Sequence, residues 1–353
     1  MKIAFNQGLS RVHDAMEGLV LSYQDNYKQV YKDYSFTVSK NAAEALGFIQ
    51  DHVDFAIPCR ELFFSRDREA AVSFARSRFI PEDITVDAFA DHLAELTDEQ
   101  ARLIMLINLN DAAKQSLDHE VLVRLSRGEG DVVAFIRQIT LPPAVKWEAM
   151  EFFDDTRGAM QAFVGLVKRY LPVYKQVLDT YKNAIEGFET YVSQGVGADS
   201  KQFLNRVVRD AIELESENIS VGILFFRSRS LTCVTIDDKL RVFIGTEYED
   251  TVKQALGGED ISMLVFKNLA DKTRFQILNL LKSGDLYGQE IAEKVGITLA
   301  TVSYHMSFLL AANLVRLEKI GQKGYYTLQK QALKRCIAYL DTTFGLSEAK
   351  GDE

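Results

Sequence analysis

Residues 288–314 read GQEIAEKVGITLATVSYHMSFLLAANL, and this stretch decides the fold of the C-terminal part of the chain. The spacing of apolar residues predicts a short helix that ends at Gly296, because glycine readily adopts the left-handed conformation that closes a helix. Thr298 is a typical N-cap for a second helix, which runs to about Ala312. Two short helices joined by such a tight turn define a helix-turn-helix motif.

The second helix has an outward face of small or uncharged residues. Val302, His305, Met306 and Leu309 recur at helical spacing and are expected to face the core. A solvated helix would carry Lys and Glu on its other side, whereas an uncharged face suits a helix that enters the major groove of DNA. His305 is included only as a secondary contact. The expected DNA-binding residues are Thr298, Leu299, Ala300, Thr301, Ser303, Tyr304, His305, Ser307, Arg316, Lys319 and Lys323.

The flanking sequence completes a winged helix-turn-helix. A helix from 261 to 270 precedes Asp271, a predicted N-cap for a helix over 272–282. Residues 314–320 and 325–328 read as two strands of a wing around a tip at 321–324, and 331–341 as a terminal helix. Arg316, Lys319 and Lys323 on the wing are expected to hold the DNA backbone.

Charge is unevenly distributed along the chain, whose net charge is -9. Residues 261–340 contain 11 Lys and Arg against 5 Asp and Glu, a net charge of +6, which leaves -15 for the rest. A phosphate backbone responds to the local charge, so the basic segment is compatible with DNA despite the acidic total.

Several short motifs follow one another in a characteristic order in the C-terminal region. They closely resemble the successive motifs of the ArsR family of winged-helix regulators. The resemblance implies a homodimeric repressor in which terminal helices pack two subunits together, so that two recognition helices meet successive grooves of a pseudo-palindromic operator in double-stranded DNA. The segments that carry it are Leu269-Ala270-Asp271-Lys272-Thr273-Arg274, Glu290-Ile291-Ala292, Thr301-Val302-Ser303-Tyr304-His305-Met306, Ala312-Asn313-Leu314-Val315 and Gly324-Tyr325-Tyr326-Thr327-Leu328.

The sequence departs from the metal-sensing members of that family. They bind metals through cysteines around the helix before the turn or through acidic and histidine ligands on the last helix. Here the first region reads Leu286-Tyr287-Gly288-Gln289-Glu290, and the last helix offers only Cys336 and Asp341. Without soft ligands or paired imidazoles, no metal site and no cofactor are expected.

The preceding body, residues 1–258, is expected to be largely helical, with a joint near 142–143 at Pro142-Pro143. Short segments rich in Val, Ile, Phe and Thr suggest a small antiparallel sheet at about 219–245, and residues 2–6 an edge strand. Gly257-Gly258 reads as a hinge before an ArsR-like domain over 259–346, and 347–353 as a disordered tail. The fold class is therefore mainly α, of the α+β type.

The body also resembles, in layout more than in motif, the large domain of unknown function that precedes the winged helix in a subset of ArsR-type regulators. This implies a regulatory domain that senses a non-metal small molecule or a partner, whose pocket the sequence does not name. Its aromatic residues, such as Phe163, Tyr170 and Tyr174, would line such a pocket or pack the core. Arginines between 60 and 78 would bind an anion or form a salt-bridged helix face.

Other function classes find little support. No nucleophile elbow, zinc-protease, phosphate-loop or dinucleotide-binding motif occurs, so we expect no enzyme. Two alternatives remain open: a constitutive DNA-binding or scaffolding protein, and an enzyme-like body fused to a DNA-binding module. The three scattered cysteines suggest no disulfide framework, and the absence of a secretion signal or membrane span favours a cytoplasmic protein.

Overall fold

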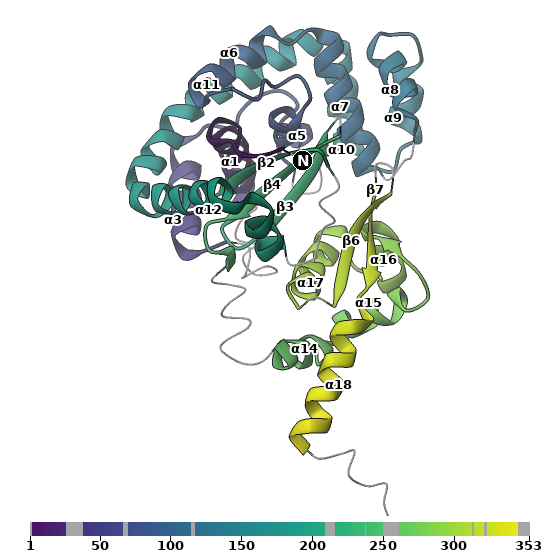
Figure 1. Ribbon diagram of the computed structural model, residues 1–353. Helices are drawn as coiled ribbons and strands as arrows, with labels where there is room; N and C mark the ends of the chain where they lie inside the picture. The colour runs from purple at the N-terminus through teal and green to yellow at the C-terminus, as the bar shows by residue number, and fades with distance from the viewer. Residues whose placement is uncertain are drawn as a thin grey trace, which may run out of the picture. The chain divides into compact units, whose positions relative to one another are not determined.

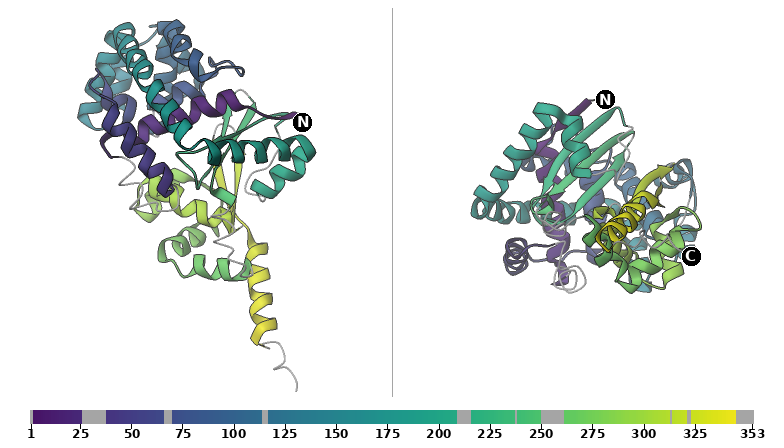
Figure 2. Two further views of the ribbon diagram at one scale, coloured as in Figure 1. Left: turned by 90° about the vertical axis from the view of Figure 1, so that its left-hand side faces the viewer. Right: turned by 60° about the horizontal axis from the view of Figure 1, so that its bottom comes forward.

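The computed structural model describes residues 2–25, 38–65, 70–113, 117–208, 216–236, 238–249, 261–312, 314–320 and 323–344. The chain forms two compact units (Figures 1 and 2). The N-terminal unit comprises Met1–Gly197 and Ser216–Thr246, and the C-terminal unit comprises Ala198–Glu215 and Glu247–Glu353. The expected hinge at Gly257-Gly258 and the tail 347–353 lie outside the described residues.

A four-stranded sheet runs through the N-terminal unit in the order β1-β2-β4-β3. Its strands are β1 (Lys2–Phe5), β2 (Asn218–Leu224), β3 (Leu231–Ile236) and β4 (Lys239–Gly245). β3 and β4 pair antiparallel as predicted, but β1 pairs parallel to β2, and β2 parallel to β4. The expected antiparallel sheet is therefore mixed. Long helical connections separate β1 from β2, and such connections join parallel strands, whereas a hairpin needs a short turn.

Helices make up most of the N-terminal unit. The central one, α1 (Gln7–Ser22), has 13 of its 16 residues buried, so it lies inside the unit rather than on its surface. Asn6 caps α1 with its side chain, which accepts a hydrogen bond from the N–H of Leu9 at 3.0 Å. The other helices that begin in this unit are α3 (Lys40–His52), α4 (Arg60–Phe64), α5 (Ala70–Arg76), α6 (Val86–Glu95), α7 (Asp98–Ala112), α8 (His119–Ser126), α9 (Val132–Gln138), α10 (Pro143–Asp154), α11 (Thr156–Thr180) and α12 (Lys182–Val208), and the part of α12 from Ala198 on belongs to the C-terminal unit.

One long helix contains a proline in its interior. α11 continues through Pro172 to Thr180, and α12 begins at Lys182. Proline removes one backbone hydrogen bond from a helix interior. Burial of Tyr170, Leu171 and Tyr174 on both sides of Pro172 stabilises the continuous helix. Pro143 is the first residue of α10, where proline is well tolerated.

A row of polar residues on α1 fixes this helix to the sheet. Ser10 Oγ donates to the carbonyl of Ile223 at 2.9 Å and accepts from the N–H of the same residue at 2.8 Å. Asp14 Oδ1 accepts from the N–H groups of Phe225 and Phe226 at 2.7 and 3.0 Å. The polar groups of α1 thus take up backbone donors at the end of β2, which would otherwise be buried without partners.

One turn further along α1, the buried carboxylate of Glu17 joins three elements. It accepts hydrogen bonds from Arg76 Nη2 on α5 at 2.7 Å and from Arg227 Nε after β2 at 2.6 Å. His13 Nε2 lies 3.3 Å from Glu17 Oε1. Burial works to raise the pKa of Glu17, but Arg227, His13 and Arg76 outweigh it and hold that pKa below its ordinary value. Arg76 is therefore held in a salt-bridge network, while Arg66 and Arg68 lie outside the described residues.

The aromatic residues named from the sequence belong to the core. Phe163, Tyr170 and Tyr174 are fully buried. Phe63 of α4, a helix that the sequence analysis missed, stacks on Phe163 with ring centroids 4.4 Å apart. The hydroxyl of Tyr170 donates to the carbonyl of Ala15 at 2.7 Å. These contacts favour core packing over a pocket for these rings.

The C-terminal unit contains the predicted winged helix-turn-helix. Its strands form an antiparallel sheet in the order β5-β7-β6. The wing tip is shorter than expected, because Lys319 pairs with Gly324 and Ile320 with Lys323 in the ladder. The elements are α14 (Ile261–Leu269), α15 (Lys272–Leu281), β5 (Leu286–Tyr287), α16 (Gly288–Val295), α17 (Leu299–Ala311), β6 (Val315–Ile320), β7 (Lys323–Leu328) and α18 (Lys330–Phe344).

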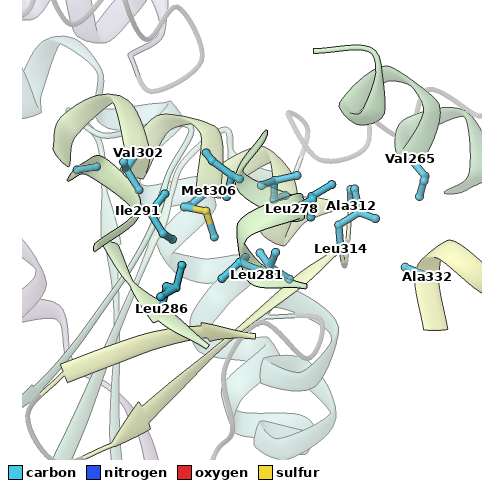
Figure 3. Close-up of a cluster of buried hydrophobic side chains, with 14 of the residues drawn as sticks. Val265, Leu278, Leu281, Leu286, Ile291, Val302, Met306, Ala312, Leu314 and Ala332 are labelled. Carbon is cyan, nitrogen blue, oxygen red and sulfur yellow. The ribbon is translucent and has the colours of Figure 1, made fainter. Parts of the chain in front are cut away.

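This unit has its own apolar core (Figure 3). Ile277 and Leu281 of α15, Ile291 of α16, and Val302 and Met306 of α17 are all buried in one cluster. The helix-turn-helix is therefore fixed by side-chain packing as well as by its turn. α18 packs against α14 and projects away from the wing, as Figure 1 and the left view of Figure 2 show.

Candidate nucleic-acid interface

The turn between α16 and α17 sets the start of the candidate recognition helix. Gly296 has φ 76° and ψ 33°, a left-handed conformation that favours glycine. The N–H groups of Gly296 and Ile297 both donate to the carbonyl of Ala292, at 2.9 and 3.0 Å. Thr298 Oγ1 then accepts from the N–H of Thr301 at 3.1 Å and caps α17. The positive end of the α17 dipole lies beside this cap, where an anionic phosphate is favoured.

The two faces of α17 differ as the periodicity predicts. Val302, Met306 and Leu309 are buried, and His305 is only 8% exposed. On the other side, Leu299 is 45% exposed, and Ser303 and Ser307 are exposed. Thr301 and Tyr304 are half-buried at the border. The side chain of Ala300 lies outside the described residues.

The serine hydroxyls on the outer face already donate within the helix. Ser303 Oγ donates to the carbonyl of Leu299 at 3.1 Å, and Ser307 Oγ to that of Tyr304 at 2.7 Å. Each hydroxyl oxygen keeps lone pairs that can accept hydrogen bonds from amino groups on base edges. Leu299 adds an apolar surface suited to a thymine methyl group.

His305 is placed toward α15 rather than toward solvent. Its Nδ1 atom lies 3.8 Å from Asp271 Oδ1. Burial lowers the pKa of His305 below its ordinary value, opposed by Asp271 and assisted by Arg274. A neutral, largely buried imidazole has little surface for a phosphate, so this secondary contact has less geometric support than the exposed positions.

The wing carries the basic residues singled out from the sequence. Arg316 is half-buried on β6, opposite Thr327 of β7. Lys319 and Lys323 occupy positions at the tip end of the two paired strands, but their side chains lie outside the described residues. The wing therefore places three cationic positions along one hairpin, a usual arrangement for contacts with a DNA backbone.

The described ranges offer neither a cluster of metal ligands nor a membrane-spanning helix. There, no three His, Cys, Asp or Glu side chains form a group that could hold a metal ion. Among those ranges there is also no helix long and apolar enough to cross a bilayer.

Comparison with known proteins identifies the C-terminal region. The family model described as "Bacterial regulatory protein, arsR family" matches residues 271–316. The transcriptional repressor SdpR of Bacillus subtilis is 37% identical over 76 residues, which are 22% of this chain and 84% of SdpR. The chain belongs to the ArsR family.

Other ArsR relatives differ in the direction of regulation that their names state. An arsenical resistance operon repressor of Staphylococcus aureus is 34% identical over 77 residues, covering 22% of this chain and 74% of the repressor. The transcriptional activator HlyU of Vibrio cholerae is 28% identical over 79 residues, covering 22% of this chain and 73% of HlyU. This ArsR protein is thus a DNA-binding transcriptional regulator, and the family match lies within its C-terminal unit.

Sequence reasoning missed two features of this region. Phe275 on α15 is 49% exposed, whereas the apolar residues Leu278 and Leu281 of the same helix are buried. The guanidinium of Arg274 stacks on the ring of Phe308, 4.7 Å from its centroid. The side-chain types were visible in the sequence, but the contact depends on how α15 crosses α17.

Proposed function

We propose that the chain is a homodimeric transcriptional repressor that reads a pseudo-palindromic operator with α17. The observation that carries this proposal is the uncharged outer face of α17, where Leu299, Ser303 and Ser307 follow the capped turn at Thr298. Charged residues would normally occupy an exposed helix face, so the composition favours contact with base edges. The wing positions Arg316, Lys319 and Lys323 would hold the phosphate backbone.

The experiment uses a duplex selected by the wild-type protein from a random-sequence library. Leu299→Ala should weaken binding to that duplex about tenfold and leave binding to a scrambled duplex nearly unchanged, because losing recognition of one base pair in a site costs roughly 1 to 3 kcal/mol. Asn279→Ala, at an exposed position of α15, is the matched control and should change neither affinity. Failure to enrich any duplex would contradict operator reading.

Exposed apolar residues support pairing with a second copy of the chain. Phe275 on α15 is 49% exposed, and Ile337 and Phe344 on α18 are 66% and 69% exposed. Large apolar side chains in such positions favour a covered interface. A two-fold pair would present two copies of α17 to successive major grooves.

Dimer formation is tested by sedimentation together with operator binding. Ile337→Glu should dissociate the dimer and weaken binding to the selected duplex at least tenfold, because each monomer would then engage one half-site. Lys334→Gln, an exposed change on the same helix, should leave both measurements unchanged. A wild-type protein that sediments as a monomer on the duplex would contradict this part of the proposal.

The N-terminal unit is the proposed sensor of a non-metal ligand or partner. It has its own buried core and sheet, distinct from the apolar core that holds α17. The donor groups do not fit the metal sites of metal-sensing ArsR proteins, because Leu286–Tyr287 and the start of α16 contain no cysteine, and Cys336 is buried. A metabolite that alters operator affinity 5- to 150-fold would support sensing. Constant affinity with every metabolite and with cell extract would support the constitutive alternative.

A further inference from the structure

A contact that depends on orientation joins α15 to α17, the proposed DNA-reading helix. This contact lies outside the apolar core of the unit. The guanidinium of Arg274 lies over the ring of Phe308, 4.7 Å from the centroid. Tyr304, one turn earlier on α17, meets Phe308 edge-on with centroids 5.0 Å apart. Cation–π and edge-to-face contacts depend on orientation, whereas the methyl groups of Val302 and Leu309 pack with little directional preference.

The other side of Arg274 is fixed by the start of α15. Its Nη2 atom lies 3.7 Å from Asp271 Oδ2 and donates to the carbonyl of Lys267 at 3.4 Å. Asp271 is itself fixed, because its Oδ1 atom accepts from the N–H of Arg274 at 2.8 Å as the N-cap of α15. The side chain of Arg274 is only 15% exposed. The guanidinium is therefore held between α14, the cap of α15 and one ring of α17.

The ring of Phe308 lies close to the exposed face of α17 that carries Ser303 and Ser307. Phe308 directly follows exposed Ser307, and Tyr304 directly follows exposed Ser303. A rotation of α17 about its own axis would separate Phe308 from Arg274 and would turn both serines relative to the DNA. The buried residues of α17 oppose a large rotation, and the stacked cation adds a directional constraint on the side of the helix next to the exposed serines.

We propose that Arg274 is a positioning residue for base reading: by stacking on Phe308 and pairing with Asp271, it sets the rotation of α17 and so the direction of Leu299, Ser303 and Ser307. This role rests on the proposed reading of DNA by α17. Arg274 contacts no base in this role. A competing role, direct pairing of Arg274 with a phosphate, makes a different prediction about salt.

The test measures binding of the full chain to the selected duplex and to a scrambled duplex of the same composition. Arg274→Lys keeps the charge but loses the flat guanidinium, and Phe308→Leu keeps an apolar side chain but loses the ring. Each change should lower the ratio of specific to non-specific affinity about fivefold, the factor that corresponds to roughly 1 kcal/mol of lost stacking. The double variant should lose no more than either single variant, because both remove the same contact.

The ratio of specific to non-specific affinity distinguishes a positioning role of Arg274 from a general loss of folded protein. Loss of folded protein would lower both affinities by the same factor and leave the ratio unchanged. Lys272→Gln, an exposed change of charge two residues away, is the control and should also leave the ratio unchanged. The slope of affinity against salt should be the same for Arg274→Lys and the wild type.

Three results would overturn the proposal. One is an unchanged ratio in both single variants, and another is a double variant whose loss equals the sum of the single losses. The third is an Arg274→Gln variant that weakens binding to both duplexes equally and lowers the salt slope by about one, which assigns Arg274 to a phosphate. If no duplex is enriched in the selection, the proposed recognition of DNA by α17 is wrong, and the positioning role of Arg274 is wrong with it. If a duplex is enriched but the ratio of affinities is unchanged in the variants, only the positioning role is wrong.

Discussion

The carboxylate of Glu17 accepts a hydrogen bond from Arg227 Nε at 2.6 Å and thereby joins the buried helix α1 to the turn after β2. The same carboxylate binds Arg76 at 2.7 Å. Removing one member of a buried ion pair leaves the remaining charges without compensation, and this is more costly than the pair is worth in itself. The stability of the N-terminal unit therefore depends strongly on this one side chain.

Glu17→Gln should lower the free energy of unfolding by about 3 to 5 kcal/mol, measured by urea denaturation. Glu186→Gln is the matched control, because Glu186 lies 3.8 Å from Lys182 in an exposed pair on α12. That change should cost less than about 0.5 kcal/mol. A loss below about 1 kcal/mol for Glu17→Gln would show that the two arginines find other partners.

Asp14 should make stability depend on pH. Burial raises its pKa from 3.8 to about 7, although hydrogen bonds from Phe226, Phe225 and Tyr174 oppose the shift. The folded protein then keeps this proton up to about pH 7, while the unfolded chain loses it near pH 4. The stability contributed by Asp14 is fully present below pH 4 and is lost as the pH rises to about 7.

Asp14→Asn isolates this effect, because asparagine stays neutral at every pH. The difference in unfolding free energy between the wild type and Asp14→Asn should fall between about pH 4 and 7 and stay constant above that range. His13 titrates in the opposite sense, since burial and Arg76 lower its pKa to about 4, but its contribution is shared by both proteins and cancels in the difference. A difference that does not change with pH would refute the assignment.

Gly18→Ala should destabilise the N-terminal unit, although alanine usually stabilises a helix. A methyl group at Gly18 would collide with the ring of Phe226. Such overpacking costs about 1 to 3 kcal/mol, visible as a lower midpoint of thermal unfolding. Gly187→Ala on α12 is the control, because the added methyl group meets no heavy atom within 4 Å beyond the neighbouring backbone of its own helix, and it should stabilise the protein by roughly 0.5 to 1 kcal/mol.

Gly296→Ala should cost about 1 kcal/mol and weaken binding to the selected duplex. The φ of 76° at Gly296 disfavours any residue with a Cβ, and the resulting strain would affect the turn that sets the orientation of α17. Gly296→Asn should cost less, since asparagine tolerates the left-handed region better than alanine. Calorimetry and binding measured on the same samples check both changes, and equal losses for Ala and Asn would argue against backbone strain as the cause.

The C-terminal unit was largely predictable, because the ends of its helices are set by residues close to them in the sequence. Asp271 and Thr298 cap helices, and Gly296 ends one, all within a few residues of the positions they control. The inward face of α17 likewise follows from periodicity. The stack of Arg274 on Phe308 was not predictable, because it joins residues from two helices whose crossing angle has no local signature.

The N-terminal unit was predictable only in its helical content. The parallel pairing of β1 with β2 joins strands far apart in the chain, so no local turn sequence predicts it. The continuation of α11 through Pro172 depends on tertiary burial that outweighs a local helix breaker. The buried network around Glu17 brings together residues from α1, α5 and the turn after β2, which lie far apart in the sequence and share no local pattern.

The nearly complete burial of α1 has a consequence for the order in which the protein is made. Asp14 and Glu17 receive their partners at Phe225, Phe226 and Arg227 only after the intervening helices have been synthesised. Contacts of such long sequence separation form slowly, and an emerging chain must keep its early apolar surface exposed until they close. On the ribosome, we expect Asp14 and Glu17 to lack these partners until β2 and the turn after it have emerged, and we expect chaperones and proteases to reach the nascent chain most easily before that point.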